Sequence, residues 1–258
     1  MRIRSILLAL LAVSCGGGGN SSDKDQPSVG DVRGAGYKTI AIEVDYQVGA
    51  EPYVGSAGRF DDVWQITREN VTRAFASTQK TVTVPNQLAQ MESFTDFAQA
   101  SFTQDDILRV AGTHRQTRSA NGTASFYVVW LNGYFDDGNG PNQDILGVSL
   151  GRTGVLAIFK PVIASSESPV LPGLAKALEQ STLVHELGHA FGLVNDGVAL
   201  ASAHEDTAHP HHCTNEKCVM NWSAERVGSA VAIARAFLTT GSTVVYDAAC
   251  LGDLDAAR

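Results

Sequence analysis

The sequence has few basic residues, few cysteines and no internal repeat. Its 258 residues carry a formal net charge of −8 at neutral pH, from 19 lysines and arginines against 27 aspartates and glutamates. Nucleic acids and anionic membrane surfaces bind basic patches, and no long basic run is present, so we expect no nucleic-acid partner. The hydrophobic content of 44% is ample for a core and predicts a globular chain.

The N-terminal apolar run, residues 6–13, is too short to cross a bilayer. It follows Arg2 and Arg4, an arrangement typical of a secretory signal. The run ends in Ala-Val-Ser before Cys15, which resembles the bacterial lipoprotein signal, in which cleavage precedes a cysteine that then carries lipid. We therefore expect a signal peptide over residues 1–14 and an extracytoplasmic chain, lipid-anchored to a bacterial membrane at the cell envelope through Cys15. An ordinary or an uncleaved signal is the alternative.

The next segment, residues 15–36, is rich in Gly, Ser and Asp. Such a composition cannot bury enough apolar surface to order the chain, which predicts a flexible tether. One folded domain is expected over residues 37–258.

Hydrophobic periodicity predicts both strands and helices in that domain. In chain order we expect a strand at 37–48, a helix at 61–77, strands at 81–84 and 125–130, one or two strands at 145–159 broken at 151–154, and helices at 173–180 and 181–191. Ser181 is the expected N-cap of the last helix and Gly192 its stop. The mixture predicts an α+β fold.

Two histidines lie one helical turn apart in the last of these helices, in the sequence HELGH. Residues four apart lie on one face of a helix, so His185 and His189 can bind one cation, which is a zinc chelate. Glu186 points into the same cleft, where it can take a proton from metal-bound water. The motif predicts a zinc hydrolase with Glu186 as general base.

The motif continues as HExxHxxG, where Gly192 supplies a positive φ that turns the chain beneath the metal. This extension resembles the metzincin clan of zinc endopeptidases. The resemblance implies a mixed twisted sheet, an active-site helix, a methionine turn and a C-terminal helix. Asn195 stands where that pattern has its third histidine, and a neutral amide is a poor zinc ligand. Asp196 is one residue out of register.

A third ligand is available further along, because His212 precedes Met220 by eight positions. Matrixin-type metzincins and archaemetzincins have that spacing between the third histidine and the methionine of the turn. Cys213, the four residues after it, Cys218, one residue and Met220 also match the archaemetzincin order. The resemblance therefore implies that His212 completes the zinc site, with residues 195–211 as an insertion.

The insertion contains other histidines. His209 and His211 are rivals for the third ligand position. His204, Glu205, Asp206 and His209 form a second hypothesis, in which another zinc or a calcium ion orders the loop.

The remaining cysteines leave two arrangements open. Archaemetzincins carry a later CxxC that completes a four-cysteine zinc site, but this chain has only Cys250 there. The four-cysteine site is therefore incomplete, and in an oxidising compartment a disulfide between Cys213 and Cys218 is the arrangement that we expect. A disulfide that uses Cys250 is also possible on sequence grounds.

The resemblance extends upstream to residues 154–161, which are similar to the edge strand that pairs with extended substrate in matrixin-type peptidases. It implies a zinc-dependent endopeptidase that acts on peptides or proteins. The competing hypothesis is a lipid-anchored protein that captures zinc through its His-rich segment without catalysis.

Overall fold

The computed structural model describes residues 32–243 and 245–257. The expected signal peptide, Cys15 and most of the expected tether lie outside the described residues. The last residues of that tether are folded, since Val32 and Arg33 are each only 4% exposed. The Arg33 guanidinium donates to the carbonyls of Ala74 and Ala257. The boundary predicted at residue 37 is therefore too late.

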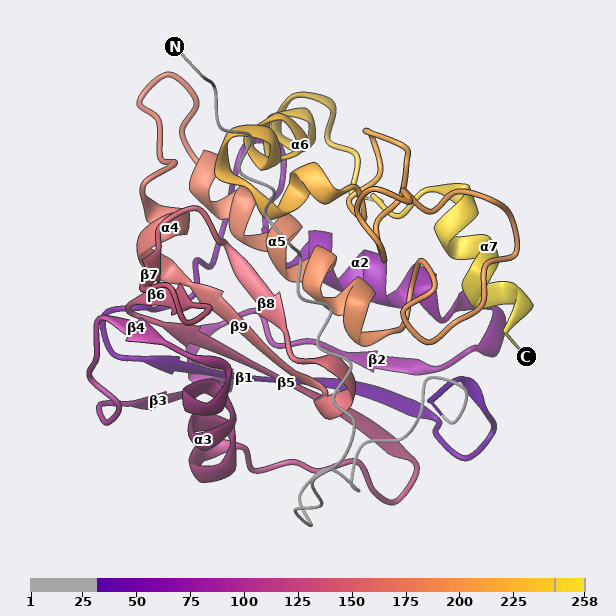
Figure 1. Ribbon diagram of the computed structural model, residues 1–258, viewed down its shortest axis with the longest axis horizontal. Coiled ribbons are helices and arrows are strands. Elements are labelled where there is room, and N and C mark those ends of the chain that lie inside the picture. Colours follow the sequence, from indigo (N-terminus) through magenta and orange to yellow (C-terminus); the bar gives the residue numbers. More distant parts are fainter. Residues whose placement is uncertain (1–31, 244, 258) are drawn as a thin grey trace.

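A twisted mixed sheet forms the centre of the molecule (Figure 1). Its strand order is β2-β1-β5-β9-β8. Strand β3 pairs with the last residues of β1, whereas β2 pairs with the first ones. All pairs are parallel except β8 with β9. The strands are β1 (Thr39–Gln47), β2 (Thr81–Thr83), β3 (Glu92–Phe94), β5 (Thr123–Leu131), β8 (Gly147–Ser149) and β9 (Val155–Phe159). A second, small sheet has the order β4-β6-β7, with β4 (Ser101–Phe102), β6 (Tyr134–Asp136) and β7 (Pro141–Asn142).

Helices cover both faces of the large sheet (Figure 1). On one face lie α2 (Gln65–Ala74), α5 (Leu174–Ala190), α6 (Val227–Thr240) and α7 (Ala248–Ala256), and on the other lies α3 (Gln104–His114). The short α4 (Lys160–Ala164) follows β9, and single 3-10 turns are η2 (Ala76–Thr78), η3 (Leu88–Gln90), η4 (Gly151–Thr153) and η5 (Trp222–Glu225). None of the described helices has the length and apolar character needed to cross a bilayer.

The predicted strands and the α+β class are confirmed. Ile40, Ile42 and Val44 alternate along β1 and are all buried. Residues of β5 and β9 are buried almost throughout because helices cover both faces of this parallel part of the sheet. The break expected at 151–154 is η4, which separates β8 from β9.

The predicted boundary at Ser181 is wrong, because α5 runs without a break from Leu174 to Ala190. The Ser181 hydroxyl donates to the carbonyl of Leu178, 2.9 Å away, inside the helix. Fourteen of the seventeen residues of α5 are buried, so its polar side chains give no reliable signal of an end. The helix begins instead after Gly173, at φ 85°.

The predicted edge strand is also wrong. Residues 155–159 form β9, which is buried and paired on both sides, by β5 and by β8. The edge of the sheet is β8, which is antiparallel to β9. Since β8 also packs against α5, it lies nearest to the helix that carries the histidine motif.

Candidate metal centre

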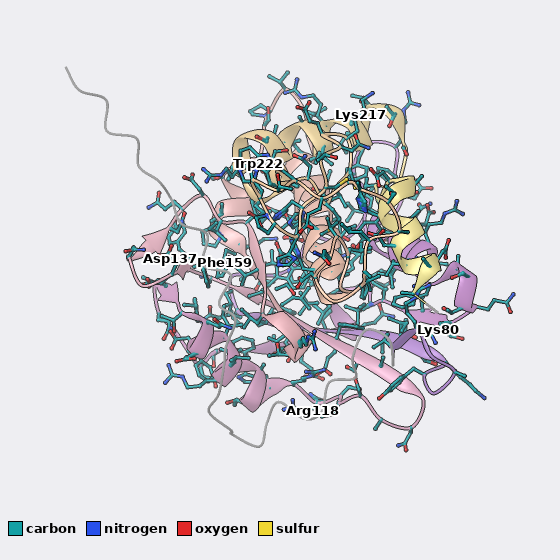
Figure 2. All side chains as sticks on the ribbon, turned by 45° about the vertical axis from the view of Figure 1, so that its right-hand side comes forward. Lys80, Arg118, Asp137, Phe159, Lys217 and Trp222 are labelled. Atoms are coloured by element: carbon teal, nitrogen blue, oxygen red, sulfur yellow. The ribbon has the colours of Figure 1, made fainter. Side chains whose placement is uncertain are left out.

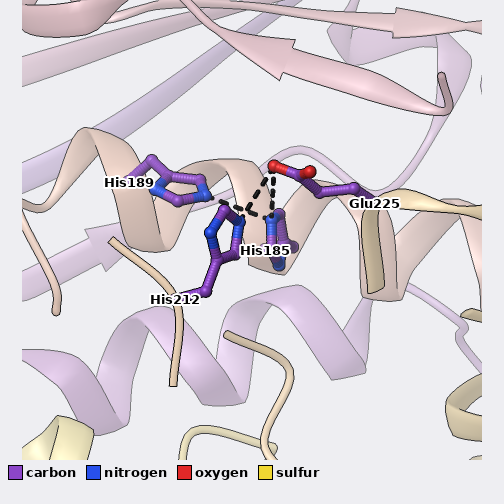
Figure 3. A group of neighbouring side chains, drawn as sticks. All are labelled: His185, His189, His212 and Glu225. Carbon is purple, nitrogen blue, oxygen red and sulfur yellow. Dashed lines mark hydrogen bonds and ion pairs between the residues drawn. The ribbon is translucent and has the colours of Figure 1, made fainter. Parts of the chain in front are cut away.

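Three histidines converge from two distant parts of the chain (Figure 3). His185 and His189 lie on α5, and their Nε2 atoms are 3.1 Å apart. His212 comes from the loop before the methionine turn, and its ring centroid lies 5.4 Å from that of His185 and 5.0 Å from that of His189. The structure thus brings together the three histidines that the sequence analysis selected.

Backbone carbonyls hold two of the rings from behind. The Nδ1–H of His185 donates to the carbonyl of Val219 at 2.6 Å, and that of His212 donates to the carbonyl of Pro210 at 2.9 Å. A carbonyl can only accept, which places the proton on Nδ1 and leaves the Nε2 lone pair free. Such partners orient the histidines that bind metals in proteins.

His189 has a carboxylate in the same role. Its Nδ1 lies 3.6 Å from Oδ2 of Asp196, so Asp196 lies behind His189 instead of replacing a ligand. Burial lowers the pKa of His189 to about 4. The imidazole is therefore neutral at physiological pH, as a metal ligand must be.

A fourth side chain, Glu225, faces the same centre and was not predicted from the sequence. Its Oε1 lies 2.9 Å from Nε2 of His212 and 3.8 Å from Nε2 of His185. Two such ligands, each about 2.0–2.1 Å from zinc in a tetrahedral site, lie about 3.3 Å apart. The spacings in this group match that value, so the residues fit a zinc ion.

Glu186 lies beside this group on α5 and is 4% exposed. Burial, and then the charge of Glu225, raise the pKa of Glu186 well above its usual range, although the Ser149 backbone amide partly offsets them. The position of Glu186 beside the metal-binding group is within the reach that proton transfer to or from a metal-bound water requires. Gly147 of β8 leaves room for this side chain, since a Cβ there would lie 3.1 Å from Cγ of Glu186.

Met220 packs against α5 at Gly188, which lies between His185 and His189 in the sequence. It is fully buried, and a Cβ added to Gly188 would lie only 2.2 Å from its sulfur. The glycine of HELGH is thus the gap in the helix surface that admits the methionine. Tyr246 closes the same space, with its hydroxyl donating to the carbonyl of Val184 at 2.6 Å.

Gly188→Ala should therefore destabilise the protein, even though alanine favours helix more than glycine does. An extra methyl group in this packed space costs about 1–3 kcal/mol, measured as the free energy of unfolding in urea. Gly112→Ala on α3 is the matched control, because a Cβ there meets nothing within 4 Å. Equal stability of the two variants would contradict this account of Met220.

The chain leaves α5 through the turn predicted at Gly192, which has φ 79°. Val194 and Asn195 follow with φ 52° and 65°, and the Asn195 side-chain amide donates to Glu205 at 3.2 Å. The insertion is fastened by Glu205, which accepts from the Asn195 side chain and from the backbone N–H of His211.

The other histidines of the insertion have partners away from the metal centre. His209 pairs with Asp206 at 2.8 Å and stacks on Trp222 with ring centroids 4.2 Å apart. His204 contacts Asp253 of α7 at 2.8 Å. The groups of metal-binding side chains found among the described residues do not include these two histidines, and His211 is not in them either. Side-chain pairing therefore accounts for the positions of His204 and His209.

Three thiols and a carboxylate form a second cluster, beside α7. Cys213, Cys218 and Cys250 are free and buried, and their sulfurs lie with a carboxylate oxygen of Asp247 within 4.8 Å of one another. The expected Cys213–Cys218 disulfide is therefore absent from the structure. Figure 2 shows Lys217, from the loop between these two cysteines, on the side of the sheet that carries α6, far from Arg118 on the opposite side.

The geometry of this cluster fits a metal better than a disulfide. The sulfurs of Cys218 and Cys250 are 3.6 Å apart, close to the ~3.8 Å expected for two thiolates each about 2.3 Å from zinc. Hydrogen bonding from Cys218 lowers the pKa of Cys213. Backbone amides of Asn215 and Asp247 also point at sulfurs. Asp247 stands three residues before Cys250, at the position of the first cysteine of a CxxC. Its part in this cluster was not predicted from the sequence.

We expect the zinc-loaded protein to hold about two zinc ions per chain and Cys250→Ser to hold about one, because serine is a poor zinc ligand. Elemental analysis with a thiol titration under denaturing conditions measures both quantities. Three titratable thiols among Cys213, Cys218 and Cys250 are the expected result. A Cys213–Cys218 disulfide in the unreduced protein would contradict this assignment.

Comparisons with known proteins give distant structural likenesses. No protein-family model and no curated protein matches this chain. Among solved structures it is similar to an archaemetzincin from Methanopyrus kandleri, at 14% identity and a TM-score of 0.48, over 86% of this chain and 96% of that one. It is also similar to a zinc-dependent peptidase from Methanocorpusculum labreanum, at 13% identity and a TM-score of 0.45, over 83% of this chain and 99% of that one. At this distance the function rests on the side chains of the site.

Proposed function

We propose that the protein is a zinc-dependent endopeptidase of the metzincin type, with His185, His189 and His212 as zinc ligands. The observation that carries this proposal is the convergence of the three Nε2 atoms with a buried Glu186 beside them. Capture of zinc alone needs the histidines but gives Glu186 no role, whereas hydrolysis needs a base at that position. The motif and the geometry thus favour the same chemistry.

Zinc bound there supplies a Lewis acid that polarises the scissile carbonyl and lowers the pKa of water. Glu186 takes the proton from the attacking water and passes it to the leaving amine. The carbonyls of Val219 and Pro210 and the Asp196 carboxylate keep the imidazoles oriented. Met220 supports α5 from below and contributes no polar group.

Strand β8 is the element best placed to bind a peptide. It is the last strand of the sheet, and its Gly147 packs against α5 with Thr182 and Glu186 as neighbours. An extended peptide can add to such an edge through backbone hydrogen bonds, which accommodates many side chains. We therefore propose peptides or proteins as substrates, bound along β8 and not along residues 155–159.

The cysteine cluster has a structural role in this proposal. Its ligands come from the loop at Cys213 and Cys218 and from α7 at Asp247 and Cys250. A metal there joins the two segments that flank the methionine turn and contributes directly to folding free energy.

The location of the enzyme rests on residues outside the described part of the chain. The run at 6–13 before Cys15 supports export and lipid anchoring at the cell envelope. Metabolic labelling with a fatty acid, compared between the wild type and Cys15→Ala, is the corresponding measurement.

A chelator experiment tests the proposed function. Fluorescently quenched casein should be cleaved by the zinc-loaded protein, and cleavage should stop on addition of 1,10-phenanthroline and return when zinc is restored. Binding of zinc without any cleavage would favour the non-catalytic alternative. Cleavage unaffected by the chelator would rule out the zinc enzyme.

A further inference from the structure

Glu225 is the one member of the metal-binding group that the catalytic proposal leaves without a role. It is the last residue of η5, and within the described part of the chain its carboxylate is the only one grouped with the three histidine nitrogens, all within 4.8 Å of one another. Figure 3 shows its carboxylate directed at His185 and His212, across the group from His189. A carboxylate oxygen so close to two lone pairs needs either a proton or a cation between them.

The backbone that carries Glu225 is held on both sides. Asn221 starts η5, accepting from the backbone N–H of Ser223 at 3.1 Å and donating to the carbonyl of Cys213 at 2.8 Å. After Glu225, Arg226 forms an antiparallel bridge with Ile145, two residues before β8. The carboxylate is therefore positioned by the same segment that links the methionine turn to the edge strand.

The side chain itself has freedom that the histidines lack. Its side chain is 35% exposed, whereas those of His185 and His212 are 1% and 4% exposed. Among the described residues, the hydrogen bond and ion pairs of its carboxylate are with His212 and His185. Rotation about its side-chain bonds can thus move the carboxylate to solvent without any change in the backbone.

The charge balance favours contact with the metal. Three neutral imidazoles leave the full charge of a divalent cation uncompensated, and a carboxylate ligand halves it. Catalysis needs an open fourth position, because structural zinc sites are closed and catalytic sites keep one position for water or substrate. A bound Glu225 would occupy that position.

We propose that Glu225 is the fourth ligand of the resting metal centre, and that it must leave for water or substrate to enter. This inference rests on the proposed zinc site and deepens it. The closed state holds zinc more tightly and is inactive, and the open state has the three histidines and an exchangeable position. A ligand that offers its own oxygen anion to the metal, such as a hydroxamate, competes with Glu225 for that position.

The test compares the wild type with Glu225→Gln, which keeps the size of the side chain but offers only a neutral amide. Glu216→Gln is the matched control, since it removes an exposed carboxylate nine residues earlier in the chain. Zinc affinity is measured by competition with a chromophoric chelator. Acetohydroxamate affinity is measured on the cobalt-substituted protein from its visible absorption, which reports the ligands of the metal.

Glu225→Gln should bind zinc about tenfold or more weakly and acetohydroxamate about tenfold more tightly than the wild type, because the same position changes from occupied to open. Its kcat/KM at full zinc loading should exceed that of the wild type, because no carboxylate ligand has to leave before water or substrate enters. A residue that only supports the ligands would not weaken zinc binding and strengthen acetohydroxamate binding at the same time. Glu216→Gln should change neither affinity.

Three results would overturn the inference. They are unchanged zinc affinity in Glu225→Gln, unchanged or weaker acetohydroxamate binding, and loss of peptidase activity at full zinc loading. Neither affinity measurement depends on hydrolysis. If the protein binds zinc but cleaves nothing, the proposed function is contradicted, and the two affinities still show whether Glu225 is a metal ligand. Glu225→Ala, compared with the wild type by thermal unfolding of the metal-free protein, controls for misfolding.

Discussion

Glu186→Gln should abolish peptide hydrolysis while the metal stays bound. Glutamine fits the same buried space but cannot take a proton from water, so the loss reflects general-base catalysis, worth about 10²–10⁴-fold in rate. The measurement pairs initial rates on quenched casein with zinc content per chain. Because Glu186 is not among the grouped metal-binding atoms, zinc content should equal that of the wild type.

Glu216→Gln serves again as the control for loss of one negative charge, and it should retain full activity. Activity of Glu186→Gln within a few-fold of the wild type would show that another group takes the proton. Loss of zinc from this variant would instead show that Glu186 binds the metal.

His212→Ala should lose both zinc affinity and activity, since it removes one of three imidazoles that share the centre. A chelate with only His185 and His189 is expected to bind at least about 100-fold more weakly, by comparison with the 10–100-fold effect of losing a group behind a ligand. Competition with a chromophoric chelator gives the affinity, and casein cleavage at saturating zinc gives the activity.

His211→Ala is the matched control, because this adjacent histidine lies outside the metal-binding group. It should change zinc affinity by less than the variant at residue 212. A loss of zinc affinity in His211→Ala equal to or larger than that in His212→Ala would contradict the assignment of His212 as the third ligand. A third variant, His209→Ala, tests the remaining rival, which stacks on Trp222.

Much of this centre could be predicted from the sequence because its rules are local. The helical spacing of His185 and His189 follows from 3.6 residues per turn, and the turn at Gly192 follows from the freedom of glycine at positive φ. His212 lies far from both in sequence, and it was identified from its spacing to Met220 and from the order of Cys213 and Cys218 after it.

Glu225 and Asp247 were missed for a different reason. Glu225 reaches the histidines because η5 packs against α5. No spacing between residues in the sequence predicts this contact. Asp247 was overlooked because cysteine was expected at its position, although a carboxylate three residues before Cys250 offers a ligand at the same spacing. A search for any ligand-forming side chain at that spacing would have found it.

Both wrong predictions about helices and strands concern segments that are buried in the structure. Ser181 has the side chain of an N-cap, but it lies inside a helix that is enclosed by the sheet and by α2 and α6. Residues 154–161 were expected at the edge, yet the strand within them, β9, is buried throughout and lies inside the sheet. The short β8, with only three residues, was too brief to be recognised as the edge.

Residues 218–220 connect the cysteine cluster to the histidine group. The sulfur of Cys218 lies in the cysteine cluster, the carbonyl of Val219 accepts from His185, and Met220 supports α5. Two binding sites that share a rigid segment are thermodynamically linked, and the linkage is reciprocal. A change in the oxidation state of the three thiols should therefore change how tightly the neighbouring histidines hold a metal ion.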